Sequence, residues 1–176
     1  GDDSVEEIPE AAKAAKEPQD IDTVEQLFLN GLHLEQYRHA TFDATAYYLE
    51  ALERAPGDVR CNNAMGLWKM KHGKFEEALA YFNSAIETLT NRNPNPYNGE
   101  PYFNKGVVLN YLGRKDEAYA AFFKSCWNAA WQAAGYFNLA QIDCERADFE
   151  KALELVDKAL ISNWHNHKAR HLKAII

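Results

Sequence analysis

The residues of this chain that could do chemistry are three cysteines and a group of histidines close to its end. Cys61, Cys126 and Cys144 form no CxxC pair, and none has an evident base or cationic setting that would make its thiol a nucleophile. His167 and His171 are four residues apart, a spacing that can bring two imidazoles of a helix to one metal ion. No Asp, Glu or Cys accompanies them as a further ligand. We therefore expect reduced interior cysteines, no metal site beyond adventitious binding, and no thiol catalysis.

Other signatures of catalysis are also missing from the sequence. It contains no glycine-rich phosphate loop and no HExxH string. The acidic pairs Glu76-Glu77 and Asp116-Glu117 stand where we expect second helices to begin, and carboxylates at that place complement the helix dipole. We therefore expect a protein that is not an enzyme and that holds no cofactor.

Length and charge narrow the class of partner. The 176 residues are enough for one domain with its own core. The formal net charge is −7, but residues 1–20 hold seven acidic residues against two lysines, so the rest of the chain is close to neutral. Such a charge distribution argues against nucleic acid, whose phosphates need clustered Lys and Arg. No apolar run approaches the roughly 18 residues of a membrane helix, and no secretory signal opens the sequence.

One short string organises most of the chain. Tyr102-Phe103-Asn104 returns 34 residues later as Tyr136-Phe137-Asn138, and such a period with a fixed small residue is typical of stacked helix–turn–helix units. The expected second helices repeat a small–large–small pattern at spacings that put the three residues on one helix face. The small residues of the first helices are Gly66, Gly106, Ala140 and Ala174, with Leu32 in the first unit. The second-helix positions read Ala44, Ala78, Ala118 and Ala152, then Tyr48, Phe82, Phe122 and Val156, then Ala51, Ala85, Ser125 and Ala159.

These positions together resemble the tetratricopeptide repeat, over about residues 23–176. The resemblance implies an all-α, right-handed solenoid of antiparallel helix pairs. Its units are expected at about 25–58, 59–98 with a loop insertion, 99–132 and 133–166, with a partial unit at 167–176.

Some segments depart from the repeat pattern. Residues 1–22 form an acidic leader that we expect to be mobile or weakly docked. The first unit has Leu32 at the small position and His39 where a turn glycine is common. Large apolar residues are typical at the positions of Glu35, Lys69 and Asp143, so helix packing there departs from the pattern.

Three longer strings suggest a closer likeness. They look like the repeat segment of large bacterial proteins that also carry a galactose-mutarotase-like domain of unknown function. The likeness implies a bacterial, cytoplasmic protein in a carbohydrate setting, although nothing in these residues is that domain. The strings are GLHLEQYRH at 31–39, NRNPNP at 91–96 and WNAAW at 127–131.

The interval between the second and third units is 40 residues, which places six extra residues between Thr90 and Pro101. Its prolines and asparagines indicate an ordered loop with little helix potential. A spacer that adjusts how two repeats stack is favoured over a lip beside the groove.

The tryptophans admit two interpretations. Trp127 and Trp131 are four residues apart, so we expect both on one helical stripe. Stacked tryptophans can bind sugars, but these two follow the packing positions of a second helix, which favours burial against the next repeat. Trp68 and Trp164 are expected to be core residues for the same reason.

The expected binding surface is the concave side of the stack, which the first helices of such units line. Asn30, Asn104 and Asn138 fall at the same place in their units, where an amide can both donate to and accept from an extended peptide. The candidate groove residues are Asn30, Tyr37, Arg60, Asn63, Lys71, Phe103, Asn104, Val107, Asn110, Tyr111, Phe137, Asn138 and Gln141.

Some members of the family grip a C-terminal carboxylate with paired lysines, and that clamp is not expected here. The lysine positions read Leu29, Asn63, Phe103 and Phe137. The groove is instead neutral, aromatic and amide-rich, which suits a helix or strand segment with apolar anchors.

Two functions fit these observations. The first is a non-catalytic interaction module that binds a protein or peptide in its concave groove. The second is an intramolecular scaffold or oligomerisation module of a larger carbohydrate-related bacterial protein, whose own neighbouring domain covers part of the groove. We expect no nucleic-acid and no membrane partner in either case, and the fold alone does not choose between them.

Overall fold

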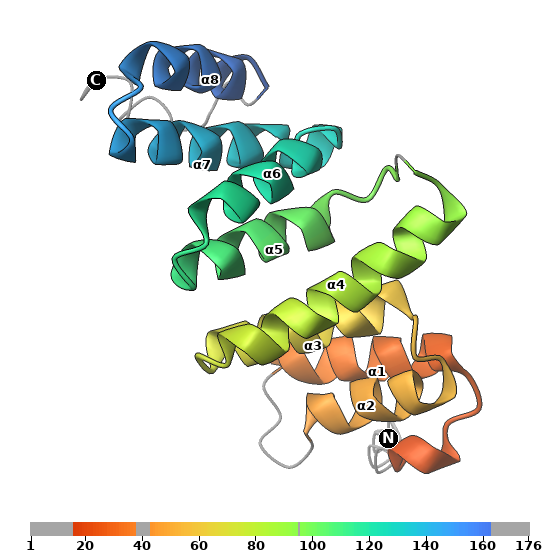
Figure 1. The fold of residues 1–176 in the computed structure, drawn as a ribbon. Coiled ribbons are helices and arrows are strands. Elements are labelled where there is room, and N and C mark those ends of the chain that lie inside the picture. The colour runs from red at the N-terminus through yellow and green to blue at the C-terminus, as the bar shows by residue number, and fades with distance from the viewer. Residues whose placement is uncertain (1–15, 38–42, 95, 163–176) are drawn as a thin grey trace, which may run out of the picture.

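The computed structural model describes residues 16–37, 43–94 and 96–162. This part of the chain forms eight α-helices, two short 3-10 helices and no strand. The helices make four antiparallel pairs that stack in chain order (Figure 1), which confirms the predicted all-α architecture of helical repeats. The elements are η1 (Pro18–Asp20), α1 (Val24–Tyr37), α2 (Ala44–Arg54), α3 (Val59–Lys71), α4 (Phe75–Arg92), α5 (Glu100–Tyr111), α6 (Lys115–Ser125), η2 (Ala129–Trp131), α7 (Gln132–Glu145) and α8 (Phe149–Ser162).

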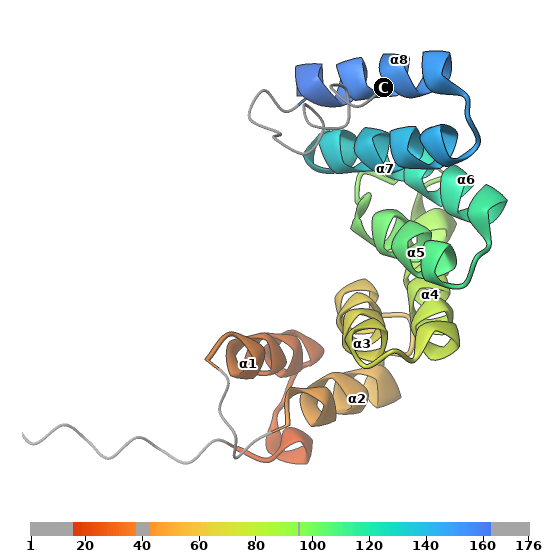
Figure 2. The same ribbon diagram turned by 90° about the vertical axis from the view of Figure 1, so that its left-hand side faces the viewer.

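The stack is curved. In Figure 2 the first helices α3 and α5 lie on the inner side of the curve, and the second helices α4 and α6 lie on its outer side. The inner side is therefore the surface on which a partner segment would meet several units at once.

Each unit is held together by a large second-helix residue that packs on a small first-helix residue. The large residues Tyr48, Phe82, Phe122 and Val156 are all fully buried. A Cβ added to Gly106 would lie 2.7 Å from the Phe122 ring, closer than real Cβ contacts come. The glycine is therefore required because the ring occupies the space that any larger side chain would need.

The first unit keeps this contact, but one residue earlier than the sequence pattern predicts. Gly31, and not Leu32, lies under Tyr48, and a Cβ added to Gly31 would be 2.5 Å from the ring. Tyr48 follows Gly31 by 17 residues, whereas Phe82 and Phe122 each follow their glycine by 16. The prediction that Leu32 takes the small position is therefore wrong, because the chain between the small residue and its partner ring is one residue longer than in the next two units.

The sequence suggested that Glu35 takes a repeat position where a large apolar residue is typical. With the alignment moved by one residue, Glu35 no longer takes that position. With Gly31 as reference, Leu34 falls at the repeat position of Lys69 and Asp143. Leu34 is buried in the core of the first unit, as a large apolar residue at that position should be.

The groove positions of the first unit move by the same residue. Leu29 matches Asn104 and Asn138, so the predicted equivalence of Asn30 with these two residues is wrong. Gln36 takes the place that the sequence alignment gave to Tyr37.

Two charged residues at the apolar repeat position have partners. Asp143 is only 2% exposed, and its carboxylate accepts a hydrogen bond of 3.0 Å from the Tyr119 hydroxyl of the preceding unit. Burial raises the pKa of Tyr119, so this hydroxyl stays protonated and donates. The Lys69 ammonium forms a 2.8 Å ion pair with Glu77.

The turns inside the pairs end their first helices with a left-handed residue. Gly73 and Gly113 have φ of 72° and 75°, a conformation that glycine adopts at little cost. Ala147 holds the same place in the fourth unit with φ of 60°, where its Cβ is strained.

The described end of the leader, residues 16–22, packs on α2, which is more order than the sequence suggested. Ile21 is buried, and the Arg54 guanidinium donates to its carbonyl and to carbonyls of η1. The Tyr47 hydroxyl donates to the carbonyl of Lys16 at 2.8 Å. The remaining division into leader and units stays a prediction, and residues 1–15 and 163–176 lie outside the described residues.

Candidate functional site

Two neighbouring hollows lie on the first-helix side of the stack. The first hollow has a volume of about 910 Å³ and is lined by Leu34, Glu35, Ala44, Leu67, Trp68, Met70, Lys71, His72, Gly73, Phe75, Val107 and Tyr111. The second hollow has a volume of about 330 Å³ and is lined by Val107, Asn110, Tyr111, Lys115 and Asn138. Because Val107 and Tyr111 line both, we treat the two hollows together as one surface, the groove.

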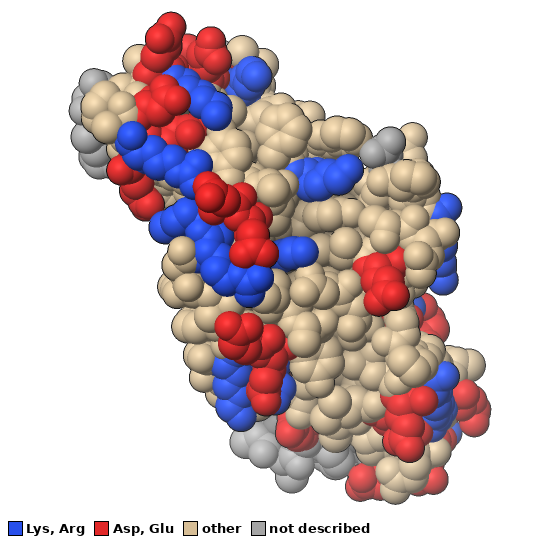
Figure 3. All heavy atoms as spheres, in the orientation of Figure 1, with Lys and Arg blue, Asp and Glu red and all other residues tan. Residues whose placement is uncertain are grey.

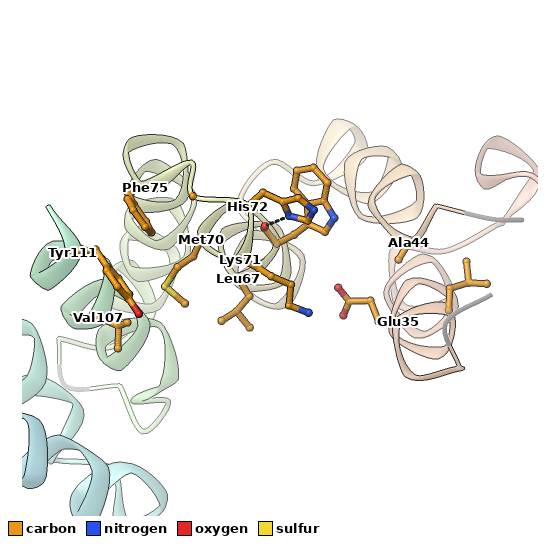
Figure 4. Close-up of a pocket in the computed structure, with 12 residues that line it drawn as sticks. Glu35, Ala44, Leu67, Met70, Lys71, His72, Phe75, Val107 and Tyr111 are labelled. Carbon is orange, nitrogen blue, oxygen red and sulfur yellow. Dashed lines mark hydrogen bonds between the residues drawn. The ribbon is translucent and has the colours of Figure 1, made fainter. Parts of the chain in front are cut away.

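The first hollow lies where α1 and α3 end and α4 begins, with α5 on its far side (Figure 4). Tyr111 lines it as an exposed aromatic residue, which is 66% exposed and stacks on Phe75 with a centroid distance of 4.9 Å and an interplanar angle of 3°. Leu67, Met70 and Val107 supply the apolar wall. This stack keeps the Tyr111 ring in one orientation, so a partner does not have to order it.

A second stacked pair closes the other side of this hollow. The His72 ring lies 4.0 Å from the Trp68 ring, and its Nδ1 is 2.7 Å from the Trp68 carbonyl oxygen (Figure 4). That distance makes Nδ1 the protonated nitrogen, because a carbonyl oxygen only accepts. Both rings are thereby oriented before any partner arrives.

The first hollow contains one acidic and one basic side chain, and they differ in their hydrogen-bond partners. Glu35 and Lys71 extend toward each other from α1 and α3 (Figure 4), but they form no ion pair. Glu35 accepts a 3.1 Å hydrogen bond from the Tyr48 hydroxyl, whose pKa is raised mainly by burial. Lys71 is exposed and has no ion pair within the described part of the chain. The first hollow therefore holds one carboxylate and one ammonium group that face each other without forming an ion pair.

The second hollow contains an unsatisfied acceptor. Asn110 Oδ1 is buried and has no hydrogen-bond partner among the described residues. The Asn138 amide is already engaged, since its Nδ2 donates to the Ala134 carbonyl at 2.8 Å. Lys115 forms a 3.0 Å ion pair with Glu145. A buried acceptor left without a donor costs about 1–3 kcal/mol, so a rotation of the half-buried Asn110 side chain that brings this oxygen to a donor is favoured.

Charged side chains gather along the edge where the helix pairs turn. Figure 3, which views the side of the second helices, shows Lys and Arg interleaved with Asp and Glu along that edge. Two of these contacts join the third and fourth units, Lys115 to Glu145 at 3.0 Å and Arg146 to Asp116 at 2.6 Å. Both contacts pair a cation with a carboxylate, a pattern that does not favour binding of a phosphate backbone.

The hollows bring together Lys71, Val107, Asn110, Tyr111 and Asn138 from the predicted groove residues. Others lie outside the hollows because they serve the contacts between helices. Asn104 is only 5% exposed, and its Nδ2 donates to Asn63 Oδ1 across α5 and α3 at 2.9 Å. The open amide that the sequence predicted at Asn104 is therefore used inside the domain.

The predicted aromatic residues of α5 and α7 also contribute to packing. Phe103 lies 5.5 Å from the Phe122 ring and 5.0 Å from the Trp131 ring. Phe137 is half-buried against the same core. Neither side chain lines a hollow.

The remaining candidates lie outside both hollows at exposed positions. Arg60 pairs with Glu25 at 2.5 Å and stacks on Phe28. Asn30 Nδ2 donates to a carbonyl of its own helix at 2.7 Å. Tyr37 packs beside His33 and is 65% exposed, and Gln141 is exposed on α7.

Sequence reasoning missed Trp68, His72 and Phe75 as groove residues. The alignment looked for groove positions only in the first helices, whereas Phe75 begins the second helix of its pair. A signal was available, because an aromatic residue follows the turn by two positions at Phe75 and Phe149. The contact with Tyr111 of the next unit depends on how two units stack, which no single repeat shows.

The prediction of a shared helical stripe for Trp127 and Trp131 is wrong. Helix α6 ends at Ser125, and Trp131 lies in the separate η2 turn. Trp127 is 55% exposed, with the Lys124 ammonium 4.3 Å from its ring, so its predicted burial is also wrong. Trp68 and Trp131 are half-buried, and Trp164 lies outside the described residues.

The insertion begins later than predicted, because α4 continues to Arg92. Its end lies on the turn after α6, where Asn128 Nδ2 donates to the Tyr97 carbonyl. Its described residues line neither hollow. Its role as a spacer stays a prediction.

The cysteines have the properties of interior thiols. Burial raises the pKa of Cys61 and of Cys126 to about 12, the opposite of what nucleophilic catalysis requires. Cys144 is half-buried, and burial raises its pKa as well. Across the described ranges no group of three or more His, Cys, Asp or Glu side chains could hold a metal, and His167 and His171 lie outside them. None of the described helices has the length and apolarity to span a bilayer.

Comparison with known proteins supports the fold. No protein-family profile matches the chain. The solved structures that share its fold include MamA, with 16% identity, a TM-score of 0.71 and coverage of 86% of this chain and 80% of MamA. PilF of Pseudomonas aeruginosa has 19% identity, a TM-score of 0.73 and coverage of 86% and 66%. Cut9 of the APC/C Cut9–Hcn1 hetero-tetramer has 16% identity, a TM-score of 0.74 and coverage of 86% and 29%. These are tetratricopeptide-repeat proteins, and the likeness shows the same fold here.

Curated relatives match part of the sequence. They include the uncharacterized protein MJ0572 of Methanocaldococcus jannaschii, with 44% identity over 52 residues. The match spans 30% of this chain and about half, 54%, of that relative.

Proposed function

We propose that this chain is a non-catalytic interaction module whose groove binds a segment of a protein partner. The observation that carries this proposal is the exposed Tyr111 ring, held by its stack on Phe75 at the boundary of the two hollows. Tyrosines with a fixed ring and an exposed face are common anchors of protein interfaces, because they bury much apolar area at small entropic cost.

The chemistry of the two hollows defines the partner segment. The first hollow suits an apolar or aromatic side chain against Leu67, Met70 and Val107. The second hollow suits a hydrogen-bond donor, such as a backbone N–H, directed at Asn110 Oδ1. An extended segment with alternating side chains supplies both, since its N–H groups and its anchors point in different directions.

The carboxylate clamp of related repeats is not part of this proposal. Lys71 is the unengaged cation among the described lining residues, because Lys115 is paired with Glu145. One such lysine beside the Glu35 carboxylate makes a weak site for a free carboxylate terminus, and a weaker one for nucleic acid.

Site-specific photo-crosslinking tests this function. A benzophenone amino acid in place of Tyr111 is expected to couple to the partner in cells of the source organism, and the coupled band identifies it by mass spectrometry. The matched control carries the probe in place of Phe149, which is also an exposed aromatic residue but lines neither hollow.

The identified partner is then measured against point variants of the groove. Asn110→Leu is expected to weaken its binding about tenfold, which corresponds to about 1.4 kcal/mol. Equal coupling at Tyr111 and Phe149, or unchanged affinity in both Asn110→Leu and Tyr111→Ala, contradicts the proposal.

The alternative function is that of a scaffold or oligomerisation module within a longer polypeptide. The sequence resemblance implies a larger, carbohydrate-related bacterial protein of the cytoplasm, and the same apolar groove suits a neighbouring domain of that protein. The crosslinking experiment separates the two, because a domain of the same polypeptide gives an intramolecular product and a separate partner gives a heavier band.

A further inference from the structure

The contact between Asn63 and Asn104, here called the amide pair, leaves two hydrogen-bonding atoms unused. Asn104 Nδ2 on α5 donates to Asn63 Oδ1 on α3 at 2.9 Å. Among the described residues, no hydrogen bond involves Asn104 Oδ1 or Asn63 Nδ2. The same remainder results if both amides are turned over, because each pairing consumes one donor and one acceptor. The amide pair therefore offers one acceptor and one donor to a third group.

Both unused atoms reach the surface. In the described part of the chain, Asn110 Oδ1 is the buried side-chain oxygen or nitrogen that lacks a partner. The two unused atoms of the amide pair also lack one, so they are accessible to solvent. They belong to α3 and α5, the first helices on the inner side of the curve (Figure 2). Because the two amides hold each other, the site is oriented before a partner arrives.

The opening over the amide pair suits a slim side chain. Asn104 is 5% exposed and Asn63 is half-buried, so a main chain with its own substituents has little room to approach. A carboxamide carries an acceptor oxygen and a donor nitrogen on one carbon, which matches the two unused atoms. A carboxylate only accepts and an ammonium only donates, so either leaves one atom of the amide pair unmet.

The amide pair lies one helical turn from the apolar wall of the first hollow. Leu67 follows Asn63 by four residues on α3, a rise of about 6 Å. Val107 follows Asn104 by three residues on α5, and Leu67 and Val107 both line the first hollow (Figure 4). In an extended segment, side chains two residues apart lie on one face with a separation of about 6.6 Å. A segment along α3 and α5 therefore meets the amide pair and the wall with residues two apart.

We propose that the partner segment carries an asparagine or glutamine two residues from its apolar anchor, and that the amide pair binds this carboxamide. The carboxamide nitrogen donates to Asn104 Oδ1, and its oxygen accepts from Asn63 Nδ2. The inference rests on the proposed function of the groove, to which it adds a determinant of sequence specificity. The anchor itself lies in the first hollow against Leu67 and Val107.

Selection from a random library of short linear peptides displayed on phage tests this specificity with the full chain. Peptides with Asn or Gln two positions from an apolar or aromatic residue are expected to be enriched severalfold over the input library. Only peptides whose binding is weakened by Tyr111→Ala and unchanged by Phe149→Ala are counted, since these bind in the groove. Absence of this enrichment overturns the inference.

The variant Asn63→Asp changes the chemistry of the site while keeping the contact between α3 and α5. Its Oδ1 still accepts from Asn104, but the unused donor becomes an acceptor. The enriched residue is therefore expected to change from Asn or Gln to Lys or Arg. An unfolding midpoint in urea close to that of the parent chain confirms that the variant folds.

The matched control is Asn138→Asp, the same chemical change on the first helix of the fourth unit. The Asn138 amide already donates to the Ala134 carbonyl of its own helix at 2.8 Å. This variant is expected to keep the preference for a carboxamide. Retention of that preference in Asn63→Asp, or the same change of preference in both variants, overturns the inference.

A double-mutant cycle with one selected peptide shows whether the two groups are in contact. Replacing its carboxamide residue by leucine is expected to weaken binding to the parent chain about tenfold in fluorescence anisotropy. Against Asn63→Ala, the same replacement is expected to weaken binding less than about twofold, because the partner atom is already gone. Equal losses against both chains overturn the inference.

Failure of this inference is distinguishable from failure of the proposed function. If Tyr111 crosslinks a partner but the selected peptides show no carboxamide preference, the inference alone is overturned. If the library yields no groove-binding peptide and Tyr111 couples to no partner, both are overturned.

Discussion

The packing side of this stack repeats its chemistry from unit to unit, whereas the groove side does not. Tyr48, Phe82 and Phe122 each cover a glycine of the first helix, and all three are fully buried. The residue after that small position changes from Leu67 and Val107, which line the first hollow, to Gln141, which lines neither hollow.

The packing side repeats and the groove side varies because the two sides contact different things. Every unit has to fit the same neighbouring helix, and close packing tolerates little variation in volume. The groove side has to fit only its occupant, so its residues are free to differ among units. The groove of this molecule is accordingly concentrated between α1 and α5 and becomes more polar toward α7.

The largest expected effect comes from enlarging a packing-side glycine. Gly66→Val brings a branched side chain into the Phe82 ring and is expected to lower the free energy of unfolding by about 3 kcal/mol, at the upper end for overpacked cores. Urea denaturation measures this. The control Ala80→Val, at an exposed position of α4, is expected to cost less than about 1 kcal/mol.

A second variant separates overpacking from loss of glycine itself. In the fourth unit Ala140 takes the place of the glycine and Val156 takes the place of the aromatic ring. The smaller valine side chain therefore leaves room for the alanine Cβ. Gly66→Ala combined with Phe82→Val is expected to be less destabilised than the sum of the two single variants, because the two residues are in contact. Strict additivity contradicts the packing account.

The next effect concerns the polar contact between the third and fourth units. Tyr119→Phe leaves the buried Asp143 carboxylate without its hydroxyl donor and is expected to lower the free energy of unfolding by about 1–3 kcal/mol. The matched variant Tyr81→Phe tests a half-buried tyrosine for which no hydrogen bond to a buried acid is present, and little change is expected. Equal losses in both variants contradict a specific role for this hydrogen bond.

A smaller and opposite effect is expected at the turns. Ala147→Gly relieves a left-handed alanine and is expected to raise the free energy of unfolding by about 0.5–1 kcal/mol. Gly113→Ala places alanine in the same conformation and is expected to lower it by a similar amount. Thermal unfolding of both variants measures the pair, and two changes of the same sign would disagree with this account.

The smallest effects on stability are expected on the groove side. Tyr111→Ala removes an exposed ring and is expected to change the free energy of unfolding by less than about 1 kcal/mol while strongly reducing partner binding. Lys115→Gln removes an exposed ion pair and is expected to cost less than about 1 kcal/mol, less still at high salt. A loss of several kcal/mol in either variant would erase the distinction between the two sides.

Much of the packing side was predictable from sequence, because small and large residues recur at a fixed helical spacing. The prediction was wrong by one residue in α1, since a pattern of period 34 does not show where an extra residue enters a connection. Gly31 and Leu32 are neighbours in the sequence, and only contact with the Tyr48 ring distinguishes them.

The groove was predictable only in part. Lys71, Val107 and Tyr111 line the first hollow, but Asn104 is engaged by Asn63 of another unit. An amide at a groove-facing position is open or engaged depending on the residue across the neighbouring helix, and repeat alignment does not pair residues of different units.

The sequence by itself determined that this chain forms stacked helix pairs, because the period and the small–large–small pattern are local properties that each unit repeats. Its charge distribution likewise predicts that the partner is not a nucleic acid. The tertiary structure alone decided which side chains are available to a partner. Tyr111 stacks on Phe75 of the neighbouring unit, and among the described residues Asn110 Oδ1 has no donor and Lys71 forms no ion pair. Such contacts depend on the angle and register at which neighbouring pairs stack, and no single repeat encodes them.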